Sequence, residues 1–500
     1  MKNLVGKHVL VLGLGHSGLA LARWCARCGA QVTVADTRAD PPQRNALRES
    51  VPAASFVHGD MNATLLEGAA FDMLLKSPGL SPADVAGVSQ AASANNIVCG
   101  NELSLFAQAL ADLQADTGYA PQVIGITGTN GKTTVTSLAG QLVQRSGKSV
   151  AVAGNIGPTL LDTLTEKMDA DCLPDVWVLE LSSFQLDGVS DFEPTAATVL
   201  NITQDHLDWH GTFKAYADAK NKVYGAGGLM LLNRNDPLVM AAAAVQVKGK
   251  PARSYVTYGH DEPQRPGDYG IKTVNGMAWL VRALELDETI KHKRGDKNQD
   301  AELHIQPLMP VDALRIHGLH NAVNALAALG LAHAAGCALG PMLHGLREYK
   351  GEPHRVESVA VINSVEYFDD SKGTNVGATV AALAGLGAQR KLVAILGGVG
   401  KDQDFSPLAL PVSRFARAVV LIGRDASLIS AALQSTAVTL LYADSMQSAV
   451  SLASEQVQPG DAVLLSPACA SFDMFDNYEH RARVFCEAVQ ALAAEEGVLL

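Results

Sequence analysis

The chain has 500 residues, of which 48% are hydrophobic and 18% are charged, and this composition excludes a disordered, collagen-like or coiled-coil protein. Acidic residues outnumber basic ones by 51 to 39, which gives a net charge of −12. Nucleic-acid affinity depends on Lys and Arg contacts to phosphates, so DNA and RNA are not expected partners, whereas a local cluster of donors can still bind a small anion. At roughly 150 residues per domain, the length predicts about three domains.

The cysteines favour a reducing compartment, because their number is odd and they are scattered through a chain large enough to fold without disulfides. There are seven of them. Cys25 and Cys28 form a CxxC pair, but they lie at helical spacing within WCARCGA, so we interpret them as part of a buried helix and not as a redox motif. No second pair lies near them, which argues against a zinc quartet.

Neither a signal peptide nor a membrane span is expected. The N-terminus lacks a long apolar segment followed by a small-residue cleavage site. Residues 323–346 contain no Asp, Glu, Lys or Arg, but glycines and a proline interrupt them, and two packed, Ala-rich helices fit better than a span. We therefore expect a cytoplasmic protein without membrane insertion.

Short β-branched segments alternate with amphipathic ones, which predicts an α/β protein with parallel sheets and crossover helices. In the first unit we expect strands at 8–15, 30–36 and 71–79 and a helix at 16–29. The motif GLGHSG, residues 13–18, lies between the first strand and the helix, and Asp36 ends the second strand. Taken alone, this pattern predicts NAD binding, but the same glycine turn and acid could hold any nucleotide diphosphate.

The second unit again begins with a strand, a glycine-rich turn and a helix, at 122–147. GTNGKTT at 128–134 can bring backbone amides, a lysine and a threonine to a phosphate chain and Mg²⁺, so we predict a nucleotide site there. The spacing departs from the usual P-loop, because Ile126 stands where the first glycine is expected.

Further strands of the second unit are expected at 150–157, 175–183 and 196–203. The polar stretch 260–303 is interpreted as a surface excursion or long hairpin, in preference to a binding patch.

Two groups of side chains after strands of this unit could bind metal. Glu180 ends a predicted strand, where a carboxylate facing the glycine loop could ligate magnesium. Asp205, His206, Asp208 and His210 lie within six residues and suggest zinc, but the oxygen-rich setting beside a phosphate loop favours a second magnesium site with His206.

The third unit carries predicted strands at 359–364, 391–398, 418–423 and 462–468. Ligands bind at the carboxyl ends of parallel strands. The side chains expected there, Asp370, Lys372, Lys401 and Ser471, together suit a small charged molecule. We thus expect a Rossmann-like domain at 1–112, a central P-loop ATPase-type parallel sheet at 113–351 and a Rossmann-like domain at 352–500.

Seven motifs in this order resemble those of the Mur ligase family across nearly the whole chain. They are GTNGKTT, LELSSFQL, LNITQDHLDWH, GLHNAVNALAALG, PHRVE, DDSKGTN and LSPACASFDMF. The GLGHSG start and the last motifs are most similar to the members that add D-glutamate. The resemblance implies ATP-driven amide synthesis in peptidoglycan precursor assembly, in which D-glutamate is joined to the L-alanine carboxylate of UDP-MurNAc-L-alanine through an acyl phosphate.

The resemblance also implies residue roles. ATP would be bound by Gly128, Thr129, Asn130, Gly131, Lys132, Thr133, Thr134, Asn324, Arg355 and Asp370. Two magnesium ions would be held by Thr133 and Glu180 and by His206 and a carbamylated Lys220. The UDP-substrate would contact Leu14, His16, Ser17, Asp36, Arg38, Ser77, Gly79, Asn155 and Gln185. D-glutamate would contact Thr374, Lys401 and Ser471. The groups expected to act in the chemistry are Lys132, His206, Lys220 and Lys401.

Two residues depart from the family pattern: Tyr478 replaces an apolar aromatic residue near D-glutamate, and His16 replaces a smaller polar one. Three alternatives stay open at this point. They are a related ligase for another amino acid or for folate, an NAD-dependent oxidoreductase, and a P-loop switch or motor that only cycles nucleotide. A monomer that closes around its substrates is expected.

Overall fold

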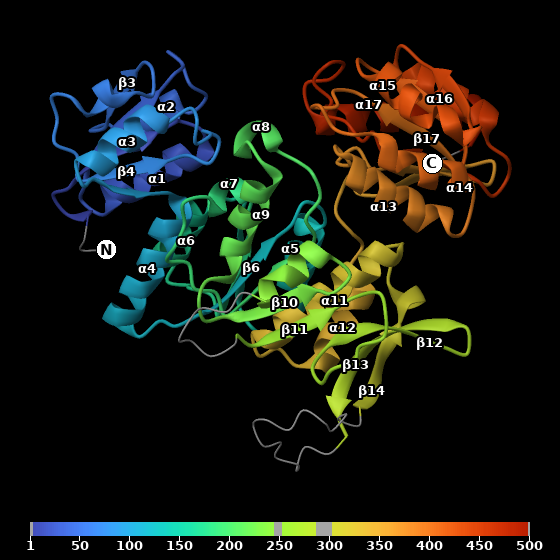
Figure 1. The fold of residues 1–500 in the computed structure, drawn as a ribbon, viewed down its shortest axis with the longest axis horizontal. Coiled ribbons are helices and arrows are strands. Elements are labelled where there is room, and N and C mark those ends of the chain that lie inside the picture. Colours follow the sequence, from blue (N-terminus) through green and yellow to red (C-terminus); the bar gives the residue numbers. More distant parts are fainter. Residues whose placement is uncertain (1–3, 245–252, 287–302, 499–500) are drawn as a thin grey trace. The chain divides into compact units, whose positions relative to one another are not determined.

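A computed structural model describes residues 4–244, 253–286 and 303–498 and is shown in Figure 1. The chain divides into two compact units. The first contains Met1–Thr273, Trp279–Met309 and Ala325–Leu346, and the second contains Val274–Ala278, Pro310–Asn324 and Arg347–Leu500. Helix α11 (Leu319–Ala334) contributes residues to both units.

The first unit begins with a five-stranded sheet of order β3-β2-β1-β4-β5, all parallel. Its strands are β1 (His8–Leu12), β2 (Gln31–Asp36), β3 (Ser55–His58), β4 (Met73–Lys76) and β5 (Val98–Gly100). The three predicted strands are confirmed, and β3 and β5 are the two that the sequence analysis did not identify. Strand order reverses between β1 and β4, which is where open parallel sheets bind ligands.

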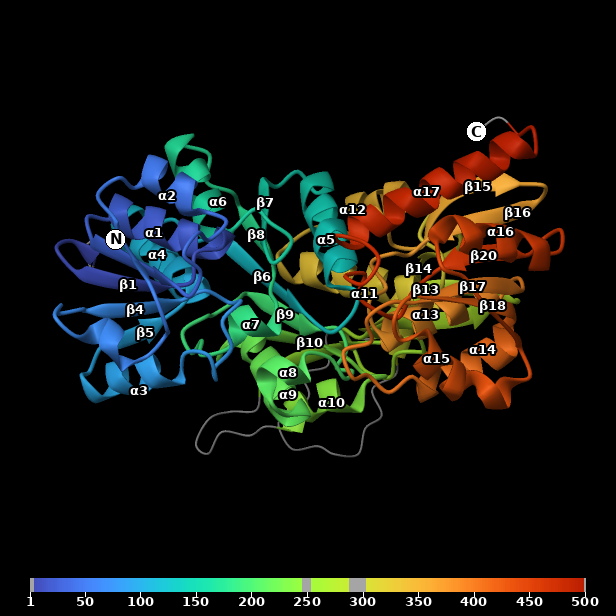
Figure 2. The same ribbon diagram turned by 90° about the horizontal axis from the view of Figure 1, so that it is seen from above.

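Helices cover both faces of this sheet, as Figure 2 shows. Helix α1 (His16–Arg27) packs on the face that carries Val9 and Val11, and α3 (Ala86–Ala94) packs on the face that carries Leu10 and Leu12. Helix α2 (Arg44–Ser50) and a 3₁₀ turn (Ala63–Leu66) complete this part. Cys25 is buried in α1 and Cys28 is buried at the C-cap of this helix; both are unpaired, and burial raises the pKa of Cys25 to about 12. The buried-helix interpretation is confirmed.

The second sheet of this unit has six parallel strands in the order β11-β10-β9-β6-β8-β7. They are β6 (Gln122–Thr127), β7 (Val150–Gly154), β8 (Val176–Glu180), β9 (Ala196–Val199), β10 (Leu229–Asn233) and β11 (Tyr255–Tyr258). Its helices are α4 (Glu102–Thr117), α5 (Lys132–Arg145), α6 (Leu160–Asp169), α7 (Ser183–Leu186), α8 (Leu207–His210), α9 (Phe213–Asn221) and α10 (Pro237–Met240). The expected boundary after residue 112 falls within α4, and the domain limits stay a prediction.

The polar stretch 260–303 forms a hairpin in its described part, as expected. Strands β12 (Tyr269–Val274) and β13 (Met277–Glu285) are joined by Asn275–Gly276, both with positive φ, and β14 (Leu303–Pro310) completes a three-stranded sheet. KHKRGDKNQD, residues 291–300, lies outside the described residues. Residues 323–346 fall in two helices, α11 and α12 (Leu339–Glu348), as predicted. Among the helices of the described chain, none is long and apolar enough to cross a membrane.

The second unit is built on a six-stranded sheet of order β15-β16-β20-β17-β18-β19. Its strands are β15 (Glu357–Ile362), β16 (Val365–Asp369), β17 (Leu392–Gly397), β18 (Ala416–Ile422), β19 (Thr439–Tyr442) and β20 (Ala462–Leu465). Its helices are α13 (Val376–Gly387), α14 (Ala409–Phe415), α15 (Ala426–Leu433), α16 (Met446–Gln456) and α17 (Tyr478–Glu495). Helices α13–α15 cover one face, and α16 and α17 cover the other (Figure 2).

One predicted strand of this unit departs from the parallel pattern. Strand β15 corresponds to the segment predicted at 359–364, but it pairs with β16 in the antiparallel sense. The two strands are separated only by Asn363 and Ser364, and a two-residue connection cannot make the crossover that a parallel pair needs.

Candidate functional site

The glycine-rich loop lies between β6 and α5, where the sequence predicted it. Gly131 has φ +83 and immediately precedes Lys132, the first residue of α5. A Cβ on Gly128 would lie 2.9 Å from the Leu200 Cβ, so the loop needs a glycine where it passes the end of β9. The start of a 14-residue helix with such a loop presents backbone amides that suit a phosphate chain.

The segment after β9 holds this loop in place. Asn201 accepts a hydrogen bond from the Asn130 amide (2.8 Å) and donates its own side-chain amide to the Asn130 carbonyl (3.0 Å). The Thr129 hydroxyl accepts from the Thr203 amide (3.0 Å) and donates to the Thr203 carbonyl (3.1 Å). The loop is therefore fixed before any ligand arrives, which lowers the entropic cost of binding.

Two lysines meet at one carbonyl of the loop. The Nζ atoms of Lys132 and Lys220 each donate to the Gly128 carbonyl at 2.9 Å, and Lys132 also donates to the Thr129 carbonyl at 3.0 Å. Lys220 lies on α9 and is only 2% exposed. Burial, followed by the charge of Lys132, moves the pKa of Lys220 well below its usual value. Such a shift increases the fraction of the amine that is uncharged and nucleophilic.

Glu180 stands at the end of β8 beside the loop, since β8 pairs with β6. It is 1% exposed, and its Oε1 accepts from the Asn155 side-chain amide at 2.8 Å. Its Oε2 is buried and finds no hydrogen-bond partner among the described residues. A buried carboxylate oxygen without a donor is costly unless a cation binds it, so this arrangement fits a magnesium ligand.

The four side chains of the DHLDWH segment do not converge as zinc ligands. His206 has φ +53, and its Nε2 lies 3.6 Å from the Asp205 carboxylate. Asp208 is exposed, and the His210 ring is hydrogen-bonded to the Ser183 hydroxyl at 2.9 Å. Burial, despite the opposing charge of Asp187, lowers the pKa of His210 to about 4. His206 and His210 also pack against the Phe184 ring.

Two cavities lie at the carboxyl ends of the strands of the first unit. The first, of about 430 Å³, is lined by Gly13, Gly15, His16, Ser17, Asp36, Thr37, Arg38, Ser77, Pro78, Gly79 and Leu80. The second, of about 600 Å³, is lined by His16, Ser17, Pro78, Gly79, residues 154–159, Asp162, Ser182, Phe184 and Gln185. The structure thus brings together the residues expected for the UDP-substrate, except Leu14, whose amide donates to Asp36 at 2.7 Å.

Asp36 accepts hydrogen bonds from its neighbours in the first cavity. Arg38 donates to both of its oxygens at 2.8 Å. Burial alone would raise the pKa of Asp36, but the hydrogen bonds from Arg38 and from the Leu14 amide outweigh it and hold the pKa at about 2. The carboxylate is therefore ionised at neutral pH and can accept a hydrogen bond from a ligand hydroxyl or N–H group.

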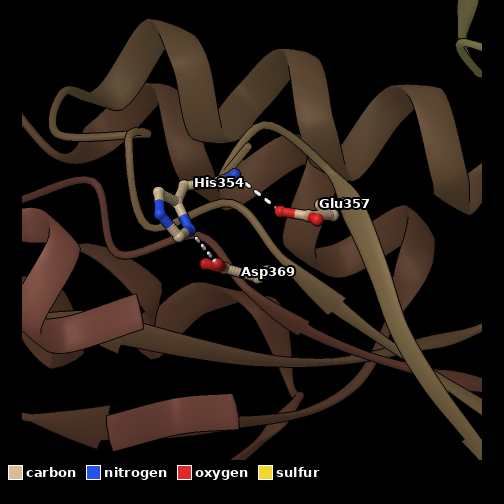
Figure 3. Close-up of side chains that lie close together, drawn as sticks. All are labelled: His354, Glu357 and Asp369. Atoms are coloured by element: carbon tan, nitrogen blue, oxygen red, sulfur yellow. Dashed lines mark hydrogen bonds and ion pairs between the residues drawn. The ribbon is translucent and has the colours of Figure 1, made fainter. Parts of the chain in front are cut away.

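In the second unit, the loop before β15 is tied to the end of β16 by three side chains drawn in Figure 3. The His354 Nδ1 lies 2.6 Å from the Asp369 carboxylate, and the His354 amide donates to Glu357 at 2.9 Å. One ring nitrogen of His354 and one carboxylate oxygen from each of Glu357 and Asp369 lie within 4.8 Å of one another. Among the described residues, this is the one cluster of three or more His, Cys, Asp or Glu side chains close enough to hold a metal ion. Because His354 contacts Asp369 through its ring and Glu357 through its backbone amide, we interpret this cluster as a brace for the adjoining Arg355 and Asp370.

Asp370 is buried directly after β16. The Ser466 hydroxyl donates to its Oδ2 at 2.6 Å. Burial raises the pKa of Asp370 to about 7, against this hydrogen bond and the charge of Arg355. Asn324, expected at the same ligand, belongs to the second unit through the first turns of α11 and donates to Asn321 at 3.2 Å.

The residues expected to bind D-glutamate follow strand ends of this sheet. Val399 and Ala470 form an isolated bridge, which brings the loops carrying the exposed Lys401 and the buried Ser471 side by side. Lys401 has φ +52. Thr374 follows in the loop after β16, where its amide donates to the Lys372 carbonyl at 2.8 Å.

Sequence reasoning missed Arg481, which organises these loops. Arg481 lies on α17, is 1% exposed, and donates to the Ser371 hydroxyl (3.0 Å), the Ser371 carbonyl (2.8 Å) and the Cys469 carbonyl (3.1 Å). Burial lowers its pKa to about 10. The available signal was its position four residues before Phe485 on the buried face of the helix, where an arginine needs internal acceptors.

Comparison with known proteins agrees with this architecture. Family profiles match residues 7–100 (Mur ligase MurD-like, N-terminal domain), 126–332 (Mur ligase middle domain) and 354–469 (Mur ligase, glutamate ligase domain). A UDP-N-acetylmuramoylalanine–D-glutamate ligase of Albidiferax ferrireducens is 65% identical, over 99% of this chain and 98% of that protein. The protein of the same name from a Polaromonas species is 57% identical over the full length of both.

Solved structures show the same fold at low identity. A pseudomurein peptide ligase type C of Methanothermus fervidus matches 97% of this chain and all of that chain, with a TM-score of 0.54 and 17% identity. The UDP-N-acetylmuramate–alanine ligase of Thermotoga maritima gives the same coverage, TM-score and identity.

Proposed function

The chain belongs to the Mur ligase family, and we propose that it joins D-glutamate to UDP-N-acetylmuramoyl-L-alanine at the expense of ATP, in peptidoglycan precursor synthesis. The observation that carries this proposal is the 65% and 57% identity, over nearly the whole chain, with ligases of that name. The oxidoreductase and nucleotide-switch alternatives are set aside for the same reason. The ligase would act in the cytoplasm, which is supported by seven unpaired cysteines.

The chemistry requires an activated carboxylate, because a free carboxylate is a poor electrophile for an amine. A carboxylate oxygen of the L-alanine residue attacks the γ-phosphorus of ATP, and ADP leaves. The amine of D-glutamate then attacks the carbonyl carbon of the acyl phosphate, phosphate leaves, and the amine loses a proton. Catalysis of such a transfer is mostly positioning and charge neutralisation.

In the proposed complex, the loop from Gly128 to Thr134 holds the phosphates of ATP, and Lys132 places its charge beside the transferred group. The first cavity takes the uridine diphosphate, and Asp36 and Arg38 line this cavity only. The second cavity takes the sugar and its peptide arm, near Asn155 and Gln185. Since the two cavities share four lining residues, one elongated substrate can fill both.

Magnesium fits the residues beside the loop. Thr133 and Glu180 would hold one ion, and the buried, unpartnered Oε2 of Glu180 supports this assignment. His206 and a carbamylated Lys220 would hold a second. Bound magnesium would neutralise phosphate and carboxylate charge as the reactants meet.

Residues of the second unit also have proposed roles. Asn324, Arg355 and Asp370 would contact the ATP base, phosphates and ribose. Thr374, Lys401 and Ser471 would hold D-glutamate, with Lys401 paired to one of its carboxylates. These roles rest on the family resemblance and on the strand-end positions of the residues. The three domains would have the limits 1–112, 113–351 and 352–500.

The function is tested by phosphate release with a panel of amino acids. With ATP, Mg²⁺ and UDP-MurNAc-L-alanine, we expect D-glutamate to release phosphate and L-glutamate, L-alanine and diamino acids to give little. Omission of the UDP-substrate should abolish release, and mass spectrometry should find the amide product. Equal release without any amino acid would indicate a simple ATPase, and a preference for another amino acid would indicate a different ligase.

The state of Lys220 can be measured separately. Its amine is buried and its pKa is lowered, which increases the uncharged fraction that can attack CO₂ and lose a proton to form a carbamate. In ¹³C-bicarbonate we expect one carbamate NMR signal, which the Lys220→Arg variant should lack. Depleting CO₂ should lower activity, and bicarbonate should restore it. An unlabelled, fully active wild-type enzyme would contradict the carbamate.

A further inference from the structure

Lys76 connects the two sheets of the first unit, and the proposed mechanism assigns it no role. It is the last residue of β4, in the first sheet, and its side chain is 13% exposed. Its Nζ lies 3.4 Å from the Asp187 carboxylate and 4.7 Å from the centre of the Trp209 ring. Burial lowers the pKa of Lys76, and the charge of Asp187 opposes this shift. Asp187 follows β8 and α7, and Trp209 lies on α8 after β9, so both partners follow strands of the second sheet (Figure 1).

The neighbouring strand of the first sheet reaches the same segment. Strand β5 pairs with β4, and Asn101 follows β5 directly. The buried side-chain amide of Asn101 donates to the Gln185 carbonyl at 2.9 Å and to the Asp187 carbonyl at 3.2 Å. Two adjacent strand ends of the first sheet thus contact residues 185–187, one through backbone acceptors and the other through an ion pair.

Two other ion pairs between these parts of the chain are more open to water. Arg27 of α1 lies 2.5 Å from Asp169 of α6, and their side chains are 38% and 56% exposed. Arg23 and Asp162, on the same two helices, lie 3.7 Å apart and are 40% and 37% exposed. Exposed ion pairs contribute little to stability, whereas a cation held against an aromatic ring with less water around it is attracted more strongly. Of these three cations, Lys76 is therefore expected to contribute most.

The two substrate cavities differ in which sheet supplies their walls. All lining residues of the first cavity lie within residues 13–80, which form the first sheet and its helices together with β5. The second cavity combines four of these residues with residues at and after the ends of β7 and β8. The first cavity is therefore complete within one sheet, whereas the shape of the second depends on how the two sheets are placed.

Lys76 adjoins the walls of both cavities but lines neither of them. Residues 77–79 follow it in the chain and line the first cavity, and two of them also line the second. On the other side, Trp209 packs against Phe184, with ring centres 4.7 Å apart, and Phe184 lines the second cavity. The contacts of Lys76 therefore connect two opposite parts of the wall of the second cavity.

We propose that Lys76 is a positioning residue that sets the placement of the second cavity relative to the first. Its cation, held between the Asp187 carboxylate and the Trp209 ring, keeps the two sheets where one elongated ligand can fill both cavities. Without this cation the sheets populate other placements, and only the competent fraction binds such a ligand. A ligand confined to the first cavity does not depend on the placement. This inference rests on the proposed function, which puts uridine in the first cavity and the sugar in the second.

The expected result is a selective loss of affinity for the long ligand. Lys76→Met keeps the length of the side chain and removes its charge. It should weaken binding of UDP-MurNAc-L-alanine by about tenfold and leave binding of uridine monophosphate within a factor of about two. Isothermal titration calorimetry without ATP measures the first affinity, and competition against the long ligand measures the second. Lys76→Arg, whose guanidinium can make both contacts, should restore most of the lost affinity.

Asp187→Ala separates positioning from attraction at a distance. This variant removes a negative charge, so a general attraction between the protein and its anionic substrate would become stronger. Loss of the placement should instead weaken binding of UDP-MurNAc-L-alanine. The double variant with Lys76→Met should bind no more weakly than Lys76→Met alone, because both changes remove the same ion pair.

Lys222→Met is the matched control. Lys222 is exposed, and its charge is near enough to lower the pKa of Lys76. The same substitution there removes a neighbouring positive charge without the contacts to Asp187 and Trp209, so both affinities should change by less than about twofold.

The outcomes distinguish this role from the proposed function. An unchanged affinity of Lys76→Met for UDP-MurNAc-L-alanine, an equal loss for uridine monophosphate, or stronger binding by Asp187→Ala would overturn the role of Lys76 alone. Failure of the wild-type protein to bind UDP-MurNAc-L-alanine would overturn the proposed function. Should Lys76→Met not fold, the direction of the change in Asp187→Ala decides the question.

Discussion

Replacing Lys132 with alanine is expected to lower kcat by roughly 10³-fold or more, because it removes a positive charge next to the proposed position of the transferred phosphoryl group. The Nζ of this lysine is already held at the loop by the carbonyls of Gly128 and Thr129. The charge is thus in place before the substrates arrive, and its loss should affect the transition state more than the binding of ATP. Phosphate release with saturating substrates measures kcat, and its ATP dependence gives KM.

The matched control is Lys214→Ala, which removes a lysine whose side chain is 84% exposed on α9. It should leave kcat within a factor of about two, since exposed ion pairs contribute little. A Lys132→Ala enzyme with a raised KM for ATP and an unchanged kcat would show that Lys132 only binds the nucleotide.

Replacing Arg481 with alanine is expected to destabilise the second unit by roughly 3–5 kcal/mol, because it leaves three buried acceptors without a donor and opens a cavity. The acceptors lie on Ser371 and at the Cys469 carbonyl, in two loops that flank the proposed D-glutamate site. We therefore also expect a raised KM for D-glutamate in any folded fraction. Urea unfolding followed by circular dichroism measures the stability.

Arg483→Ala is the control on the same helix. Its side chain is 66% exposed, and its ion-pair partner Glu487 lies 3.9 Å away, so a change within about 0.5 kcal/mol in the free energy of unfolding is expected. Equal stabilities of the two alanine variants would mean that water replaces the Arg481 contacts at little cost, and the account of Arg481 as the link between the loops would be wrong.

Much of the fold could be predicted from local sequence signals, because many strands, helices and turns depend mainly on residues that are neighbours in the sequence. The glycine-rich loop, the strand that Glu180 ends and the helix that buries Cys25 each follow from side-chain type and spacing over a few positions. The short strands β3 and β5 were missed, since they are three or four residues long and largely exposed, so no hydrophobic pattern identifies them.

Features that depend on contacts between distant segments could not be predicted in this way. Ser371 is 110 residues from Arg481, and Leu161 is 59 residues from Glu102. In the sequence, Glu102 resembles an ordinary acid in the first turn of a helix, where such residues favour the helix dipole. Only the packing of α6 against α4 reveals that this carboxyl group is buried.

The lining residues that the two cavities share, namely His16, Ser17, Pro78 and Gly79, have a consequence for the design of inhibitors. Two small molecules, one seated against Asp36 and the other against Gln185, would approach each other at His16 and Ser17. A short tether that passes these shared residues would link the two fragments. Once one fragment is bound, binding of the other becomes intramolecular, so the joined compound should bind far more tightly than either fragment. A tether with a neutral hydrogen-bond acceptor could accept a hydrogen bond from the Ser17 hydroxyl. Such a compound would contact this residue without carrying the negative charge of a diphosphate.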